Sequence, residues 1–555
     1  KKKIKKKAPP TLIILLLVRK EVLENVLSIF YVVCSLKHDY ANEFKKRERS
    51  VYMNQKKLSL FGFFALTASM VLTVYEYPTF ATSKLHLVFF LLLGGILWFL
   101  PVALCAAEMS TVEGWQNGGI FSWVSQTLGE RFGFAAIFFQ WFQITVGFVT
   151  MIYFILGALS YVLNFQALNT DPLMKYIGLL VIFWGLTFSQ LGGTQRTAKI
   201  AKAGFVIGIL IPSVLLFGLA AAYFIGGNPI EIAISRKAFI PDFSQLSTLV
   251  VFVSFILAYM GVEASASHIN ELENPSKNYP LAMILLVILA IALDAIGGFS
   301  VAAVIPQKEL SLSAGVIQTF QSLILHFNSH LGWLVKVVAL MIAFGVMGEV
   351  SSWVVGPSRG MFAAAQRGLL PNFLRKTNTH GVPVPLIMIQ GVIVTIWGAV
   401  LTFGGGGNNL SFLVAISLTV VIYLVGYLLF FIGYFVLVYK KKGLKRTYNV
   451  PGKTIGKTVI AGIGFLLSIF ALLISFVPPA SIAKNEDRTY QVILLISFVV
   501  TVILPFVIYE LHDKQGHKKI EEPIHMEAGD VNTAVYPAAR GEHQIVQKEE
   551  HTLKH

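Results

Sequence analysis

The fold is decided by two apolar runs that are each interrupted by a short polar segment. Residues 60–80 read LFGFFALTASMVLTVYEYPTF, in which Tyr75, Glu76 and Pro78 interrupt an apolar run. Residues 250–266 read VVFVSFILAYMGVEASA, with Gly261 and Glu263 at the interruption. Proline removes a backbone donor and glycine loosens the backbone, so both segments are predicted to be broken helices. Paired interruptions of this kind indicate a binding site between the inverted repeats of a membrane transporter.

Uninterrupted apolar runs of about 20 residues, the length that crosses a bilayer as a helix, recur along most of the chain. The mean hydropathy is +0.69, and only 13% of the 555 residues are charged, against about 25% in soluble domains. The runs lack the two-residue alternation of a membrane barrel, so we predict an all-α polytopic membrane protein. Twelve spans are expected, near 58–82, 87–109, 133–163, 174–191, 198–225, 245–268, 281–305, 333–365, 384–403, 410–439, 456–477 and 490–512. The broken spans one and six then hold equivalent positions in two five-helix halves.

The positive charge follows the membrane topology. The net charge is +16, much of it in residues 1–52 and in loops beside apolar runs, which argues against nucleic-acid binding. With an amino terminus in the cytoplasm, the inside loops carry most of the Lys and Arg residues, so both termini are predicted to be cytoplasmic. Cys34 and Cys105 are the only cysteines, which is too few for a disulfide framework or a Cys-based metal site.

The chain is predicted to have three parts. Residues 1–52 form a basic extension that we expect to lie outside the native fold, because Met53 directly precedes the first long apolar run. A signal peptide is the competing interpretation, although no small-residue cleavage site follows. Residues 53–512 form the twelve-helix transporter domain, and residues 513–555 form a cytoplasmic tail.

Carboxylates inside predicted spans are costly in a bilayer and therefore candidates for function. Glu263 and Glu349 lie well within apolar sequence. Asp294 is a weaker candidate, because no sequence feature relates it to either interruption. Glu108 lies near the end of a span and is expected at the membrane interface.

Tyrosines form the second group of candidates. Tyr75 and Tyr77 flank the first interruption, and Tyr259 precedes the second. Tyr423 and Tyr427 lie four residues apart in mid-span and therefore share one helix face. Their hydroxyl groups are expected to line a polar path rather than to anchor the helix at the interface.

Several stretches resemble the glutamate/GABA antiporters of the amino acid-polyamine-organocation superfamily. These stretches are LFGFFA at 60–65, TASM at 67–70, VYEYPTFATS at 74–83, YMGVEASA at 259–266, VGPSRGM at 355–361 and LTVVIY at 418–423. The resemblance runs from about Met53 to the carboxyl end. It implies the LeuT-like fold, with ten core helices in two inverted repeats and two further helices.

The resemblance also implies a function without enzymatic activity and without a cofactor or metal. External glutamate would be exchanged for internal GABA across the inner membrane, supporting acid resistance together with a cytoplasmic glutamate decarboxylase. Carried over residue by residue, the positions of the substrate path match Tyr75, Glu263, Glu349, Trp353, Tyr423 and Tyr427.

In this family the cytoplasmic tail folds back as a plug that acid displaces. Here the tail keeps part of the family pattern, with Arg540 and His543 as the predicted pH-gating residues. Half of the 12 histidines lie in residues 512–555, and histidine is the side chain that charges between about pH 5 and 8.

Three alternatives stay open at this point. One is a different amino-acid exchanger of the same superfamily. Another is a sodium- or proton-coupled symporter, for which Ser351 and Ser352 would offer sodium ligands. A channel or membrane-embedded sensor is the third.

Overall fold

The computed structural model describes residues 59–115, 119–192, 200–263, 272–404, 408–480 and 482–516. The regular secondary structure of these residues is helical, apart from one isolated antiparallel bridge between Val112 and Arg446. The predicted extension 1–52 and most of the tail, with Arg540 and His543, lie outside the described residues.

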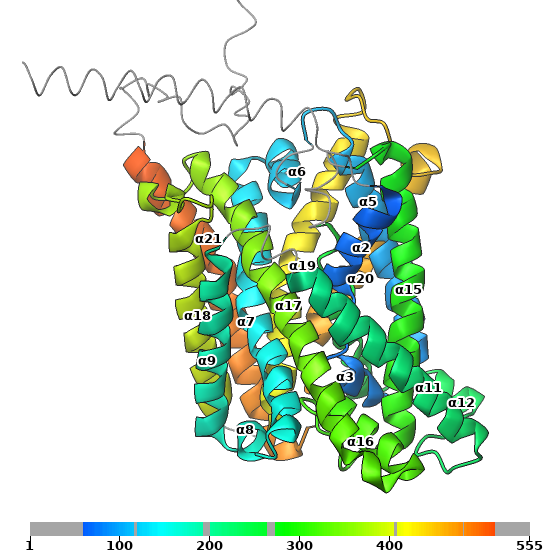
Figure 1. Ribbon diagram of the computed structural model, residues 1–555. Helices are drawn as coiled ribbons and strands as arrows, with labels where there is room; N and C mark the ends of the chain where they lie inside the picture. The colour runs from blue at the N-terminus through cyan, green and yellow to red at the C-terminus, as the bar shows by residue number, and fades with distance from the viewer. Residues whose placement is uncertain are drawn as a thin grey trace, which may run out of the picture. The chain divides into compact units, whose positions relative to one another are not determined.

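Among the described residues, ten helical segments are long and apolar enough to cross a membrane. Figure 1 shows how these helices run through the bundle. Each coincides with one predicted span, with bounds that differ by up to six residues. Their elements are α4 (His86–Gly94), η1 (Gly95–Phe99) and α5 (Leu100–Ser110); α7 (Glu130–Val162); α9 (Pro172–Gln190); η2 (Phe205–Leu210) and α11 (Ile211–Ile225); α15 (Pro275–Val304); α17 (Gly332–Gln366); α18 (Val384–Phe403); α19 (Asn408–Tyr439); α20 (Lys453–Ile474); and α21 (Asp487–Gly516).

The predicted spans one and six consist of short helices rather than continuous ones. The first contains α2 (Leu60–Val71) and α3 (Tyr77–Ala81), and the second contains α13 (Leu246–Leu249) and α14 (Phe252–Leu257). The first predicted interruption is therefore confirmed, and at the second α14 ends before Gly261, as the sequence predicts. Further short elements that we did not predict are α6 (Gly119–Leu128), α8 (Ala167–Thr170), α12 (Arg236–Phe239), α16 (Gly315–Phe327), η4 (Ser329–Leu331), η5 (Asn372–Arg375) and η6 (Lys484–Glu486).

Local chemistry explains where the helices break. Pro78 lies in the first turn of α3, where a missing N–H costs no hydrogen bond, while Glu76 holds the N-cap position. Gly261, after α14, has a φ of +95°, a backbone conformation that residues with a side chain rarely adopt. The π-helical turns η1 and η2 end two residues before Pro101 and Pro212. Proline has no backbone N–H to donate to the regular helical ladder, which favours the wider turn.

Of the ten long helices, α7 is the most enclosed. Of its most apolar 18-residue stretch, 94% is buried in the protein, against 17% for the corresponding stretch of α21. α7 packs against α17, α19, α6, α9 and α18, and α19 packs against α20 and α21. Figure 1 shows α7 and α17 side by side through the bundle. α7 is apolar all round because it has protein on every side, and α21 is apolar all round because its outer faces meet lipid.

Glycines set the closest helix contacts. A Cβ on Gly208 of η2 would lie 2.3 Å from the Cα of Gly345 in α17, so the two backbones meet directly. A Cβ on Gly297 of α15 would lie 2.3 Å from the ring of Tyr77 in α3. Small residues at helix crossings are the usual means of close packing in membranes.

Glu108 is fully buried near the end of α5, and its expected position at the membrane interface stays a prediction. Its Oε2 accepts hydrogen bonds from the Tyr434 hydroxyl (2.8 Å) and from the backbone N–H of Val450 (2.9 Å). Its Oε1 pairs with Arg446 (3.0 Å) and Lys457. This Glu108 cluster ties α5 to α19, to α20 and to the loop 440–452 between them. A buried carboxylate with two bases and two further donors has its charge compensated.

Candidate functional site

A small cavity lies where the two helix breaks meet α7, α17 and α19. The first break contributes three polar side chains, Thr73, Tyr75 and Glu76, and α17 contributes Glu349 and Trp353. The remaining lining residues are Val71, Gln143, Ile144, Gly147, Met151, Leu257, Ala258, Met260 and Thr419. The wall is thus largely apolar with a few polar groups, as is usual for small-molecule sites.

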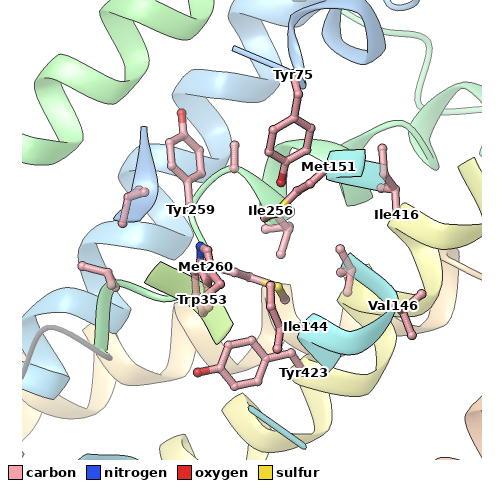
Figure 2. Close-up of a cluster of buried hydrophobic side chains, with 14 of the residues drawn as sticks. Tyr75, Ile144, Val146, Met151, Ile256, Tyr259, Met260, Trp353, Ile416 and Tyr423 are labelled. Carbon is pink, nitrogen blue, oxygen red and sulfur yellow. The ribbon is translucent and has the colours of Figure 1, made fainter. Parts of the chain in front are cut away.

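The first break turns its polar groups into this cavity. Tyr75 is 4% exposed, and its ring packs edge to face on Phe154 at a centroid distance of 6.3 Å. The hydroxyl of Thr73 accepts a hydrogen bond from the backbone N–H of Tyr75 (3.4 Å), which holds the unwound turn. Glu76 follows directly, and its Oε2 atom is buried without a hydrogen-bond partner. Figure 2 shows Tyr75 and Met151 on one side of this space, with Ile144, Met260 and Trp353 on the other.

On α17, Glu349 and Trp353 lie four residues apart and so share the helix face that lines the cavity. Glu349 is 4% exposed, and its Oε2 atom is buried without a hydrogen-bond partner. Each of these carboxyl groups, on Glu76 and Glu349, thus keeps an oxygen that could accept a hydrogen bond from a ligand or pair with a positive charge.

A second group of predicted residues forms a closed hydrogen-bond cluster. Glu263 is fully buried and accepts hydrogen bonds from the hydroxyls of Tyr423 and Tyr427. The side-chain amide of Gln140 on α7 donates to Glu263 Oε1 (2.9 Å) and to the Tyr423 hydroxyl (2.6 Å). The tyrosine rings lie 4.6 Å apart on one face of α19, as their spacing predicted. We call Glu263, Tyr423, Tyr427 and Gln140 the Glu263 cluster.

Gly261 connects the cavity with the Glu263 cluster. Its backbone N–H donates to the Tyr427 hydroxyl (2.9 Å). On its other side, a Cβ would lie 2.5 Å from Cη2 of Trp353, so only a hydrogen fits against the indole ring. The unwound segment at the second break is thus clamped between a cavity residue and the cluster. A movement of this segment would therefore alter both the cavity wall at Trp353 and the hydrogen bonds of the Glu263 cluster.

The structure therefore divides the six predicted substrate-path residues into two groups. Tyr75, Glu349 and Trp353 line the cavity, whereas Glu263, Tyr423 and Tyr427 form the cluster behind the second break. Seen from the cavity in Figure 2, Tyr423 lies behind Ile144.

Sequence reasoning missed Gln140 and gave too little weight to two other residues of this region. Gln140 is a polar residue in a long apolar helix, a signal that could have been followed. Glu76 was noted only as part of the interruption. Asp294 was judged unrelated to the breaks, and this was wrong, because it interacts electrostatically with Glu76, with Tyr77 and with Tyr259.

The two serine hydroxyls considered as sodium ligands from the sequence each donate a hydrogen bond within α17. Ser351 Oγ donates to the carbonyl of Met347 (2.9 Å) and Ser352 Oγ to that of Gly348 (3.2 Å). In the described part of the chain, no group of three or more His, Cys, Asp or Glu side chains is arranged to hold a metal ion.

The comparisons with known proteins agree with one another. A model of the amino acid permease family matches residues 58–499. Glutamate/gamma-aminobutyrate antiporters of Lactococcus lactis subsp. lactis (strain IL1403) and subsp. cremoris (strain MG1363) are 89% and 90% identical over 503 residues, which is 91% of this chain and 100% of each relative. A probable agmatine/putrescine antiporter of strain IL1403 is 22% identical over 406 residues, 72% of this chain and 84% of that protein.

Proposed function

This chain belongs to the amino acid permease family, and from that premise we propose that it exchanges external glutamate for internal GABA. The observation that carries the proposal is the identity of 89–90% over the full length of two glutamate/gamma-aminobutyrate antiporters. At this identity a change of substrate would require changes concentrated in the site. The ten apolar helices fit a multi-pass membrane transporter.

The cavity chemistry supports an amino-acid substrate. Glutamate and GABA both carry an ammonium group, and Glu76 and Glu349 present unpartnered carboxyl oxygens to the cavity. We assign Tyr75, Glu349 and Trp353 to the substrate site. Trp353 offers an apolar wall for the methylene groups that the two substrates share.

The Glu263 cluster is assigned to the transport path beyond this site. Glu263, Tyr423 and Tyr427 hold the unwound segment through Gly261, so opening the path on that side requires their hydrogen bonds to rearrange. The LeuT-like arrangement of twelve helices, with two inverted five-helix repeats, is the architecture we propose for this alternating access. The ten long helices and the two broken segments fit it.

The exchange would remove protons from the cell. A cytoplasmic glutamate decarboxylase consumes one proton for each glutamate converted, and GABA then leaves in exchange for the next glutamate. We place the chain in the inner membrane with both termini in the cytoplasm, on the distribution of Lys and Arg. The tail beyond residue 512, with Arg540 and His543, is proposed as a plug that acid displaces.

Residues 53–555 are proposed to be sufficient for exchange. The two antiporters align over 503 residues, which is the length of this segment. Residues 1–52 would then be an extension that transport does not need.

Counterflow in proteoliposomes tests the function. Vesicles that contain the purified chain are loaded with GABA and placed in labelled glutamate at about pH 5, and vesicles loaded with agmatine or with buffer serve as controls. Uptake should require internal GABA and should be independent of sodium. Equal uptake into buffer-loaded vesicles would indicate a channel, and dependence on sodium would indicate a symporter. Uptake with agmatine alone would indicate a polyamine exchanger.

A further inference from the structure

Three buried carboxyl groups come together beside the substrate cavity. Glu76 is 1% exposed, and Asp294 and Glu349 are each 4% exposed. Glu76 and Glu349 line the same cavity, and Glu76 lies close enough to Asp294 and Glu349 for their charges to act on it. They come from the first break, from α15 and from α17, which are far apart in the sequence.

Asp294 lies where both helix breaks approach α15. One turn further along α15, Gly297 packs directly against the ring of Tyr77 in α3. Asp294 also interacts electrostatically with Tyr77 and with Tyr259, which precedes the second break. The hydroxyl of Tyr259 donates to the carbonyl of Leu91 (3.0 Å) and is therefore already engaged.

The group has no compensating base among the described residues. The ion pairs recorded there involve Glu108 and Glu510, and none involves Glu76, Asp294 or Glu349. Glu76 Oε2 and Glu349 Oε2 have no hydrogen-bond partner. The titratable groups that interact with the trio are the phenols of Tyr75, Tyr77 and Tyr259, which bring no positive charge. Each uncompensated charge at such depth costs several kcal/mol.

We propose that Glu76, backed by Asp294, binds a proton in the empty transporter and releases it when the ammonium group of an amino-acid substrate enters the cavity. The inference rests on the proposed function, because that function supplies the ammonium group. In this step the O–H bond of the carboxylic acid breaks, the proton leaves to water, and the carboxylate pairs with the ammonium group. Beside Glu76 the positive charge of the ammonium group takes the place of the released proton, while the substrate carboxylate adds its own negative charge elsewhere in the site.

The consequence is competition between protons and substrate at one site. The empty site is neutralised by a proton and the occupied site by the ammonium group, so neither state buries an uncompensated carboxylate at Glu76. Asp294 acts as a positioning residue, since it does not line the cavity and reaches the substrate only through Glu76.

Proton release on GABA binding tests this directly. The purified full chain in detergent is titrated with GABA at about pH 6 in buffers of different ionisation enthalpy, and calorimetry gives the protons released per GABA bound. At this pH the carboxyl and amino groups of GABA, with ordinary pKa values near 4 and 10, do not change state, so any proton comes from the protein. Binding of labelled GABA is measured in parallel.

The parent should release about one proton per GABA bound, and Glu76→Gln and Asp294→Asn should each release clearly less. Glu231→Gln, at an exposed position, should behave like the parent. Asp294→Asn covers the case in which Glu76→Gln fails to fold, since it leaves the cavity lining intact. GABA binding without proton release in the parent, or proton release unchanged in both variants, would overturn this inference and leave the proposed function standing. Absence of GABA binding would overturn the proposed function as well. Proton release by sodium chloride without GABA would indicate a cation site instead.

Discussion

Gly261→Ala should disable exchange, because the second break leaves no room for a side chain at this position. The backbone φ of +95° costs about 1–3 kcal/mol for a residue with a Cβ. The new methyl group would lie 2.5 Å from Cη2 and 2.9 Å from Cζ2 of Trp353, and such overpacking costs about 1–3 kcal/mol more. The sum is about 2–6 kcal/mol, and its lower limit corresponds to roughly 30-fold in an equilibrium constant. We expect glutamate/GABA counterflow to fall at least tenfold and the midpoint of thermal unfolding to drop.

A matched variant separates backbone strain from the contact with Trp353. Gly227 has a φ of +71°, but a Cβ there would meet nothing within 4 Å. Gly227→Ala should therefore cost only the strain and leave counterflow near the parent rate. In a Trp353→Phe background, where the ring atoms nearest to Gly261 are missing, Gly261→Ala should cost less than in the parent. Equal losses for Gly227→Ala and Gly261→Ala, or no relief in the Trp353→Phe background, would refute the reasoning.

Three further predictions follow from the remaining contacts. Tyr423→Phe removes a hydroxyl that donates to Glu263, and a hydrogen bond to a charged group is worth about 1.5–3 kcal/mol, so counterflow should fall about tenfold. Glu108→Ala leaves the buried bases Arg446 and Lys457 without their partner and should lower the free energy of unfolding by about 3–5 kcal/mol, measured as thermal stability in detergent. Truncation after Lys519 removes most of the histidine-rich tail. Since histidine becomes positively charged below a pKa of about 6.5, acid should release the tail, and the truncated protein should exchange at neutral pH nearly as fast as in acid.

Each of these predictions has its own control. Tyr434→Phe also removes a tyrosine hydroxyl from a carboxylate, but in the Glu108 cluster, so it should lower stability more than counterflow of the folded protein. Glu510 pairs with Arg131 at the surface, with about half of each side chain exposed, so Glu510→Ala should change stability by less than about 1 kcal/mol. Parent-like counterflow in Tyr423→Phe, or equal stability losses at Glu108 and Glu510, would contradict the assignments. An unchanged pH profile after truncation would place pH gating in the bundle carboxyls.

The helices could be predicted from the sequence because hydropathy and helix breaking are local properties. A run of about 20 apolar residues predicts a membrane span whatever other segments pack against it. The ends of the helices near Pro78 and Gly261 follow from the backbone chemistry of these two residues. The shared faces of Glu349 with Trp353 and of Tyr423 with Tyr427 follow from helical spacing alone.

The partners of these residues could not be predicted, because they depend on packing between distant segments. Gln140 reaches Glu263 and Tyr423 across 123 and 283 residues of sequence, and nothing local relates them. The partners of Glu108 could not be predicted for the same reason, because its bases lie on a loop and a helix more than 300 residues away. Asp294 lies near the first break because α15 packs on α3, and this contact cannot be read from the local sequence.

The central claim, that one cavity with paired carboxyl groups carries the exchange of glutamate for GABA, is tested most directly by counterflow of Glu349→Gln. This change removes the charge of a cavity carboxyl at nearly constant shape. Labelled glutamate uptake into GABA-loaded vesicles at about pH 5 should fall at least tenfold in Glu349→Gln, while uptake by the parent stays strictly dependent on internal GABA. Uptake by Glu349→Gln at the parent rate would show that the substrate does not use this cavity.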